Sequence, residues 1–204
     1  MTDGRTARRT DGRWTSVGWA LLVLAVPLSV GPSVRPSAAQ EPVKARLLGD
    51  PSPGSEAPAF SLPYFTREGP GPVDQPFTLR AELGRVVVLA FCRGLTDSAA
   101  VVLLRTFTSR YDSLFPGEVA VAAVLPEGGS ALTAAARDNA LRIKLLPDTA
   151  GRVRRLYGAQ RASTGVYVIG QNGRVTWRDL RFNPLLATGY DQIHQAVVAA
   201  NKPR

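Results

Sequence analysis

The stretch Arg85–Leu114, RVVVLAFCRGLTDSAAVVLLRTFTSRYDSL, decides the fold of this chain. Its first part, Val86–Cys92, is apolar without a break and rich in valine, as is typical of a strand covered on both faces in a parallel sheet. Thr96, Asp97 and Ser98 are each able to cap a helix. Apolar residues then recur in steps of three or four, at Val101, Leu104, Phe107, Tyr111 and Leu114. The stretch therefore predicts a buried strand, a short turn and an amphipathic helix.

Segments of the same two kinds surround this unit. Further strands are predicted at 119–125, 143–146, 164–169 and 175–180, helices at 131–139, 149–156 and 190–200, and short extended segments at 57–63 and 77–79. Asn172-Gly173 lies between the last two strands and is a strong hairpin signal. The alternation predicts an α/β fold, with a central, mostly parallel sheet, an antiparallel hairpin at its edge and helices on both faces.

The beginning of the chain has the features of an export signal. Arginines precede an apolar run at Val17–Val30, which is shorter than the roughly 20 residues of a spanning helix. Ser37 and Ala39 fit the small-residue rule for cleavage after Ala39. We therefore expect a signal peptide at 1–39, a Pro/Gly-rich linker at 40–56 and one domain at 57–204. The mature protein is then periplasmic or secreted, and a membrane anchor made by an uncleaved leader is the alternative.

The composition excludes several kinds of site. The 204 residues include one cysteine and one histidine, so no internal disulfide, multi-histidine metal site or His–Cys–Cys zinc site can form. We expect no cofactor or metal, and we expect His194 at the surface or its boundary. The net charge of +9 allows an anionic partner or membrane surface, or simply a solvated face of mixed charge. No aromatic-plus-basic module for nucleic acid is visible.

The turn after Cys92 is the predicted place of a site, because in such sheets the functional crevice lies at the carboxyl ends of the strands. A helix N-terminus there favours an anion, and a cysteine in its first turn would be a nucleophile with a lowered pKa. This turn contains no cysteine. Arg152, Arg154 and Arg155 in a later predicted helix either bind an acidic ligand or form a solvated helix face.

Several segments together resemble one family. APAFSL at 57–62 is similar to the A-P-x-F-x-L opening of the redoxin, or alkyl hydroperoxide reductase/thiol-specific antioxidant (AhpC/TSA), family. The other matching segments are GRVVVLAF at 84–91 (G-K-x-V-V-L-x-F), FCRG at 91–94 (F-Y-R-G), DTAG at 148–151 with Tyr157-Gly158 (D-x-x-G…Y-G), and YVI at 167–169 with Asn172-Gly173-Arg174 (F-V-I-D-x-x-G-x). The resemblance covers about 57–200 and implies a thioredoxin-like fold.

The chain departs from this family where the chemistry should lie. Peroxiredoxin-like members continue F-Y-R-G-x-W-C-P-x-C, and the two cysteine positions match Asp97 and Ala100. A shift of one residue brings in Thr96 or Ala99, neither of which has a thiol. The place of the family's cis-proline matches Thr164. The thiol chemistry implied by the family therefore has no matching residue here.

Cys92 is the one remaining thiol. In a regular strand it points with Val86, Val88 and Ala90 to a buried face, while Arg93 projects to the opposite side. Burial in apolar surroundings makes a thiol inert. We therefore expect a binding or accessory module without thiol catalysis, whose partner in the cell envelope is an unidentified protein or small molecule. The alternative is a one-cysteine peroxidase or oxidoreductase with an antioxidant role that uses Cys92.

Overall fold

The strand predicted at Val86–Cys92 lies at the centre of a seven-stranded sheet. The computed structural model describes residues 49–202, so the predicted signal peptide at 1–39 lies outside the described residues. The strands are β1 (Ser61–Leu62), β2 (Phe65–Thr66), β3 (Gly69–Pro70), β4 (Phe77–Thr78), β5 (Val86–Cys92), β6 (Val119–Leu125), β7 (Lys144–Pro147), β8 (Thr164–Ile169) and β9 (Val175–Asp179). The helices are α1 (Ser98–Ser109), α2 (Tyr111–Leu114), α3 (Gly129–Asp138), α4 (Arg152–Leu156) and α5 (Ala187–Ala200).

The sheet is mixed, with the order β3-β2-β7-β6-β5-β8-β9. Only β5–β6 and β6–β7 are parallel, and the other neighbouring strands of this sheet run antiparallel. The expectation of a mostly parallel sheet thus holds for its centre alone. The reason is that β8 starts where β5 ends, with Thr164 opposite Cys92, so β8 runs back along β5.

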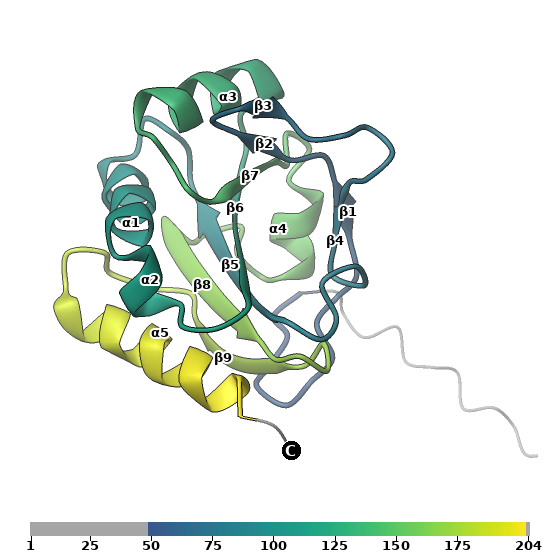
Figure 1. Cartoon of the computed structure of the whole chain (residues 1–204), viewed down its shortest axis with the longest axis vertical. Helices are drawn as coiled ribbons and strands as arrows, with labels where there is room; N and C mark the ends of the chain where they lie inside the picture. Colours follow the sequence, from purple (N-terminus) through teal and green to yellow (C-terminus); the bar gives the residue numbers. More distant parts are fainter. Residues whose placement is uncertain (1–48, 203–204) are drawn as a thin grey trace, which may run out of the picture. The chain divides into compact units, whose positions relative to one another are not determined.

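Two helical layers cover the sheet (Figure 1). Successive residues of β5 point to opposite faces. Val86, Val88, Ala90 and Cys92 belong to the core beneath α1, α3 and α5. Val87, Leu89 and Phe91 belong to the second core, together with side chains of α4 and of β4, which pairs with β1 in a separate small sheet. All seven residues of β5 are buried, as its unbroken apolar run predicts.

The helix predicted to run to Leu114 is broken at Arg110. This residue has φ −107° and ψ 21°, and it separates α1 from α2. The break lets α2 turn so that Leu114 reaches the core under α5. The short strands β2 and β3 were not predicted, and β1 starts four residues after the predicted extended segment begins. The other helices and strands begin and end within three residues of their predicted bounds.

Residues 49–56, assigned by composition to a linker, are joined to the domain. Gly54 donates its N–H to Val175 O at 2.7 Å, and Val175 N donates to Ser55 O at 2.9 Å. Asp50 forms an ion pair with Arg178 of β9. The segment thus adds to the outer edge of β9, which protects part of that edge from other chains.

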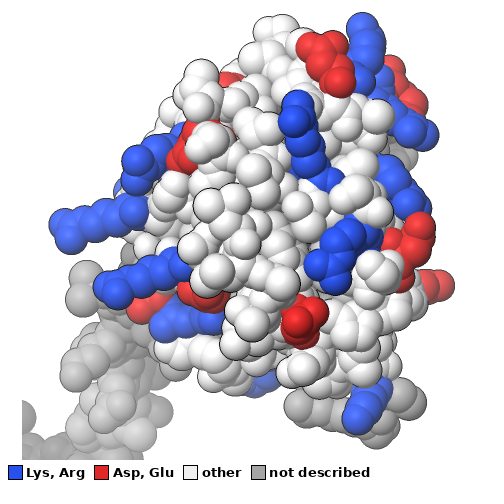
Figure 2. Space-filling model, turned by 90° about the vertical axis from the view of Figure 1, so that its left-hand side faces the viewer, with Lys and Arg blue, Asp and Glu red and all other residues white. Residues whose placement is uncertain are grey.

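The charged side chains are mixed on the side of the domain formed by α1, α2 and α5. Figure 2 shows basic and acidic residues interspersed around an uncharged central area. His194 lies half-buried on α5. No helix within residues 49–202 is both long enough and apolar enough to cross a membrane.

Candidate functional site

Cys92 ends β5 with its side chain fully enclosed. Its exposed fraction is 0%, and it packs in the core beneath α1 and α5. Burial raises the pKa of the Cys92 thiol to about 12, although the nearby Arg154 cation favours the thiolate. Arg93, the next residue, is exposed, as the alternation along the strand predicts.

Asp97 stands at the start of α1, at the position where the resemblance predicts the family's first cysteine. One carboxylate oxygen, Oδ1, accepts the N–H of Ala99 at 2.9 Å, and Oδ2 accepts the hydroxyl of Ser163 at 2.5 Å. The Ser163 hydrogen bond holds the pKa of the Asp97 carboxyl below its usual value. The position therefore holds a carboxylate that caps α1 and ties it to the loop before β8.

The other predicted site positions, Ala100, Thr96 and Thr164, place no thiol at the start of α1. Ala100 is fully buried on the inner face of α1, and Thr96 is exposed in the turn. Thr164 is buried at the first position of β8, and its hydroxyl donates to the carbonyl oxygen of Phe182. The structure thus brings Cys92, Asp97 and Thr164 to one end of the sheet, with the sulfur enclosed beneath them.

The sequence interpretation named Arg154 but missed its buried structural role. Its guanidinium donates to three backbone carbonyl oxygens, those of Cys92, Ala159 (3.1 Å) and Ala162 (3.0 Å). The residue is only 8% exposed, so the expectation of a solvated helix face is wrong for it, although Arg152 and Arg155 are exposed. The sequence signal that could have indicated the burial of Arg154 was its apolar neighbour Val153, which is also buried on this short helix.

Glu127 closes the other side of this end of the sheet. It follows β6, and its Oε1 accepts the Leu95 N–H at 2.6 Å. A side chain at Gly94 would come within 2.8 Å of the same oxygen and would push the Glu127 carboxylate away from Leu95. The turn after β5 is therefore fixed by Glu127, Asp97 and Arg154, which come from three different loops or helices.

Hydrogen bonds join the loops at this end of the sheet. The loops at 93–97, 158–163 and 180–186 are joined by hydrogen bonds, including Arg93 N to Ser163 O at 2.9 Å. No group of three or more His, Cys, Asp or Glu side chains within the described residues is placed to hold a metal ion. The chemistry available at this end is charge and hydrogen bonding.

Comparison with known proteins places the fold and the family. The sequence pattern described as the AhpC/TSA family matches residues 53–178, more than half of the chain. The chain belongs to the AhpC/TSA family. No curated protein matches it in sequence.

Solved structures of other AhpC/TSA-like proteins share its thioredoxin-like fold. Peroxidoxin BcpB from Mycobacterium tuberculosis has a TM-score of 0.61 at 16% identity, covering 74% of this chain and 99% of its own. The reduced 2-Cys peroxiredoxin of Plasmodium vivax has a TM-score of 0.62 at 17% identity, covering 72% and 80%. A protein described as the thiol:disulfide interchange protein DsbE from Chlorobium tepidum has a TM-score of 0.55 at 21% identity, covering 74% and 99%. The expected thioredoxin-like fold is confirmed.

Proposed function

We propose that this AhpC/TSA-family protein has no thiol catalysis and serves as a binding or accessory module in the cell envelope. The enclosure of Cys92, together with Asp97 and Ala100 at the family's cysteine positions, is the observation that carries the proposal. Burial raises the pKa of Cys92 and keeps the thiol protonated at neutral pH. A nucleophile must be both ionised and reachable, and Cys92 is neither.

The end of the sheet where family members act is the surface we assign to binding. Leu185 and Leu186, which precede α5, are 76% and 55% exposed, which is unusual for two adjacent large apolar residues. Their loop is connected to the site through the Thr164–Phe182 hydrogen bond. Arg93 and Arg161 are exposed in the neighbouring loops. A partner that combines an apolar side chain with a negative charge fits this surface.

Placement in the cell envelope rests on the leader sequence. The apolar run at Val17–Val30 and the small residues before Gln40 support export and cleavage after Ala39. An intact-mass measurement on the protein recovered from its native cells tests this. A mass that begins at Gln40 supports a periplasmic or secreted protein, and an uncleaved leader supports a membrane-tethered one.

Catalysis is tested by peroxide reduction and disulfide reduction with an external thiol reductant supplied. We expect both rates at background, and we expect Cys92→Ala to leave them unchanged. Turnover that disappears in Cys92→Ala would establish the alternative, a one-cysteine peroxidase or oxidoreductase. The positive charge of Arg154, which lowers the pKa of Cys92 against the larger effect of burial, is the feature that favours this alternative.

Thiol labelling separates the two functions without a substrate. An aromatic disulfide reagent should modify Cys92 slowly in buffer and rapidly in denaturant, because the sulfur is reached only when the core opens. Fast modification of the native protein, with an apparent pKa near or below 8.5, contradicts the proposal.

A further inference from the structure

A basic hollow lies away from the turn after β5, where the second strand of the sheet separates from its neighbour. β2 pairs with β7 at one position only, Phe65 opposite Leu145. The turn after β2 and the segment before β7 then enclose a hollow of about 290 Å³. Its lining residues are Thr66, Arg67, Glu68, Leu141, Arg142, Ile143 and Lys144. Leu141 and Ile143 are buried, so its floor is apolar and its rim is charged.

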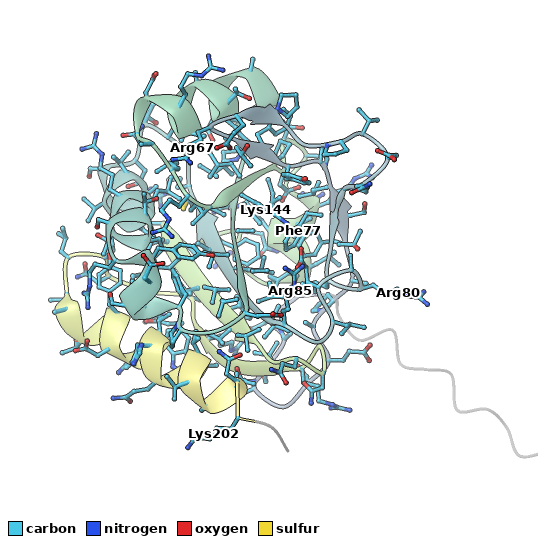
Figure 3. All side chains as sticks on the ribbon, in the orientation of Figure 1. Arg67, Phe77, Arg80, Arg85, Lys144 and Lys202 are labelled. Carbon is cyan, nitrogen blue, oxygen red and sulfur yellow. The ribbon has the colours of Figure 1, made fainter. Side chains whose placement is uncertain are left out.

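Basic side chains dominate the rim. Arg67, Arg142 and Lys144 line the hollow, and Arg85 is joined to Lys144 through a shared carboxylate. Figure 3 shows Arg67, Lys144, Phe77 and Arg85 along one face of the domain, with Arg80 directed away from them. The neighbouring carboxylates are those of Glu68, Glu82 and Asp112. Four cations thus face three carboxylates.

Lys144 is held in place as part of a built structure. Its Nζ is 3.2 Å from the Glu82 carboxylate, whose side chain is only 5% exposed, and Arg85 contacts the other oxygen of that carboxylate. The same Nζ lies 4.9 Å from the centre of the Tyr64 ring and 5.4 Å from that of Phe77. Cation–π contacts of this kind fix the direction of an ammonium group. These contacts hold the ammonium on the side of Tyr64, Phe77 and Glu82, so Lys144 adds positive charge beside the hollow while Arg67 and Arg142 supply its donors.

The outer ion pairs of the rim are ones that a ligand can replace. Arg67 contacts Glu68 and Arg142 contacts Asp112, and these carboxylate side chains are 67% and 80% exposed. Exposed pairs of this kind contribute little to stability, so a ligand can replace them at low cost. Arg67 donates from Nε to Glu68, and its guanidinium has further N–H groups.

We propose that this hollow binds a tetrahedral oxyanion, namely a phosphate group or phosphate monoester. Arg67 lies in the β2–β3 turn and Arg142 in the segment before β7, so donors approach the hollow from different sides. A phosphate group has three strong acceptor oxygens in a tetrahedral arrangement and can accept from both arginines at once. The phosphate belongs either to a free small molecule or to a lipid headgroup, since both present the same chemistry. This site is independent of the proposed binding function at the other loops.

The first test is titration of the full chain with inorganic phosphate, followed by calorimetry and by amide NMR shifts. We expect saturable binding, with the largest shifts at residues 66–68 and 141–144. Arg67→Gln should weaken binding about tenfold, because a charge-assisted hydrogen bond is lost. Arg152→Gln removes the same charge from an exposed site on α4 and should leave the affinity unchanged.

Glu68→Gln should change the affinity for phosphate in the opposite direction. The hydrogen bond from Arg67 lowers the pKa of Glu68 to about 2, so this carboxylate is charged at neutral pH and competes with the ligand. Its neutralisation should tighten phosphate binding a few-fold. Absence of saturable binding, or equal losses in Arg67→Gln and Arg152→Gln, overturns the proposal because either shows attraction by net charge alone.

Vesicles identify the source of the phosphate. Binding to vesicles that contain phosphatidic acid, a phosphate monoester, but not to phosphatidylcholine vesicles, weakened by Arg67→Gln and by free phosphate, assigns the site to a lipid headgroup. Binding of free phosphate without vesicle binding assigns it to a soluble ligand. Vesicle binding that Arg67→Gln leaves unchanged contradicts a role for this hollow.

Discussion

Arg154 and Arg155 are neighbours in the sequence but should respond very differently to mutation. Arg154→Met keeps the length of the side chain and removes the donors for three buried carbonyl oxygens, those of Cys92, Ala159 and Ala162. We expect the free energy of unfolding to fall by about 3–5 kcal/mol, because unpaired buried acceptors are costly. Arg155→Met removes one exposed bond to Ala150 and should cost about 0.5 kcal/mol or less.

Urea denaturation of the two variants measures this difference. Equal, small losses would show that the Arg154 guanidinium contributes no more than a surface side chain. A loss in Arg154→Met with unchanged urea dependence would indicate that the native state is destabilised and otherwise intact.

Asp97 should stabilise the protein in a way that depends on pH. Asp97→Ala removes the cap of α1 and the acceptor for Ser163, at a cost of about 1–2 kcal/mol near neutral pH. The pKa of Asp97 is lowered in the folded state, so its charge stabilises the fold above the ordinary pKa of about 3.9. This contribution is lost as the pH falls through the folded-state pKa.

The difference in unfolding free energy between the wild type and Asp97→Ala should therefore become smaller as the pH falls from 5 to the acid limit, which is the lowest pH at which the protein stays folded. Asp97→Asn is the matched control, because asparagine also caps helices but does not titrate. A difference between wild type and Asp97→Ala that stays constant down to that limit would show that the carboxylate charge contributes nothing.

At the scale of elements, the contact of residues 49–50 with the end of α4 is a close one. Gly158 has φ +64°, and a side chain there would lie 2.9–3.0 Å from the backbone of Asp50. Gly84 also has positive φ, of +91°, but nothing lies within 4 Å of a side chain there. Gly84→Ala should thus show backbone strain alone, of about 1 kcal/mol, and Gly158→Ala should add about 1–3 kcal/mol of crowding.

Chemical denaturation of the two glycine variants separates these contributions. The prediction is wrong if Gly158→Ala is no less stable than Gly84→Ala. In that case the segment before Ser52 moves away from α4 at no cost, and its ion pair with Arg178 does not fix it.

The elements themselves were largely predictable, and the contacts between them were not. β5 follows from its valine run and the start of α1 from Asp97, because both signals are local. Arg154 and Glu127 reach partners 62 and 32 residues away in the chain, so no spacing in the sequence reveals them. The direction of β8 also depends on where α4 ends. The alternation of strands and helices in the sequence does not show this point.

At the scale of the whole molecule, the family fold is retained, and the turn before α1 and the first turn of this helix contain no cysteine. The cap position of α1 still lies at the carboxyl end of β5, where N–H groups of the helix start point outward. The architecture that lowers a thiol pKa in such folds is therefore present here without a thiol to act on.

Asp97→Cys in a Cys92→Ala background tests whether this fold alone lowers the pKa of a thiol at the start of α1. The new thiol should react with an alkylating agent far faster than Cys92 does in the native protein, because Asp97 is partly exposed and Cys92 is not. Its apparent pKa should lie below the ordinary value of about 8.5, because the helix dipole and the free N–H groups favour a thiolate there. The rate of alkylation against pH gives this pKa directly, with Ser109→Cys, exposed at the other end of α1, in the same background as the control. A pKa at or above 8.5 would show that Glu127 and the other charges at this end cancel the helix dipole, so that restoring the thiol alone would not restore the chemistry.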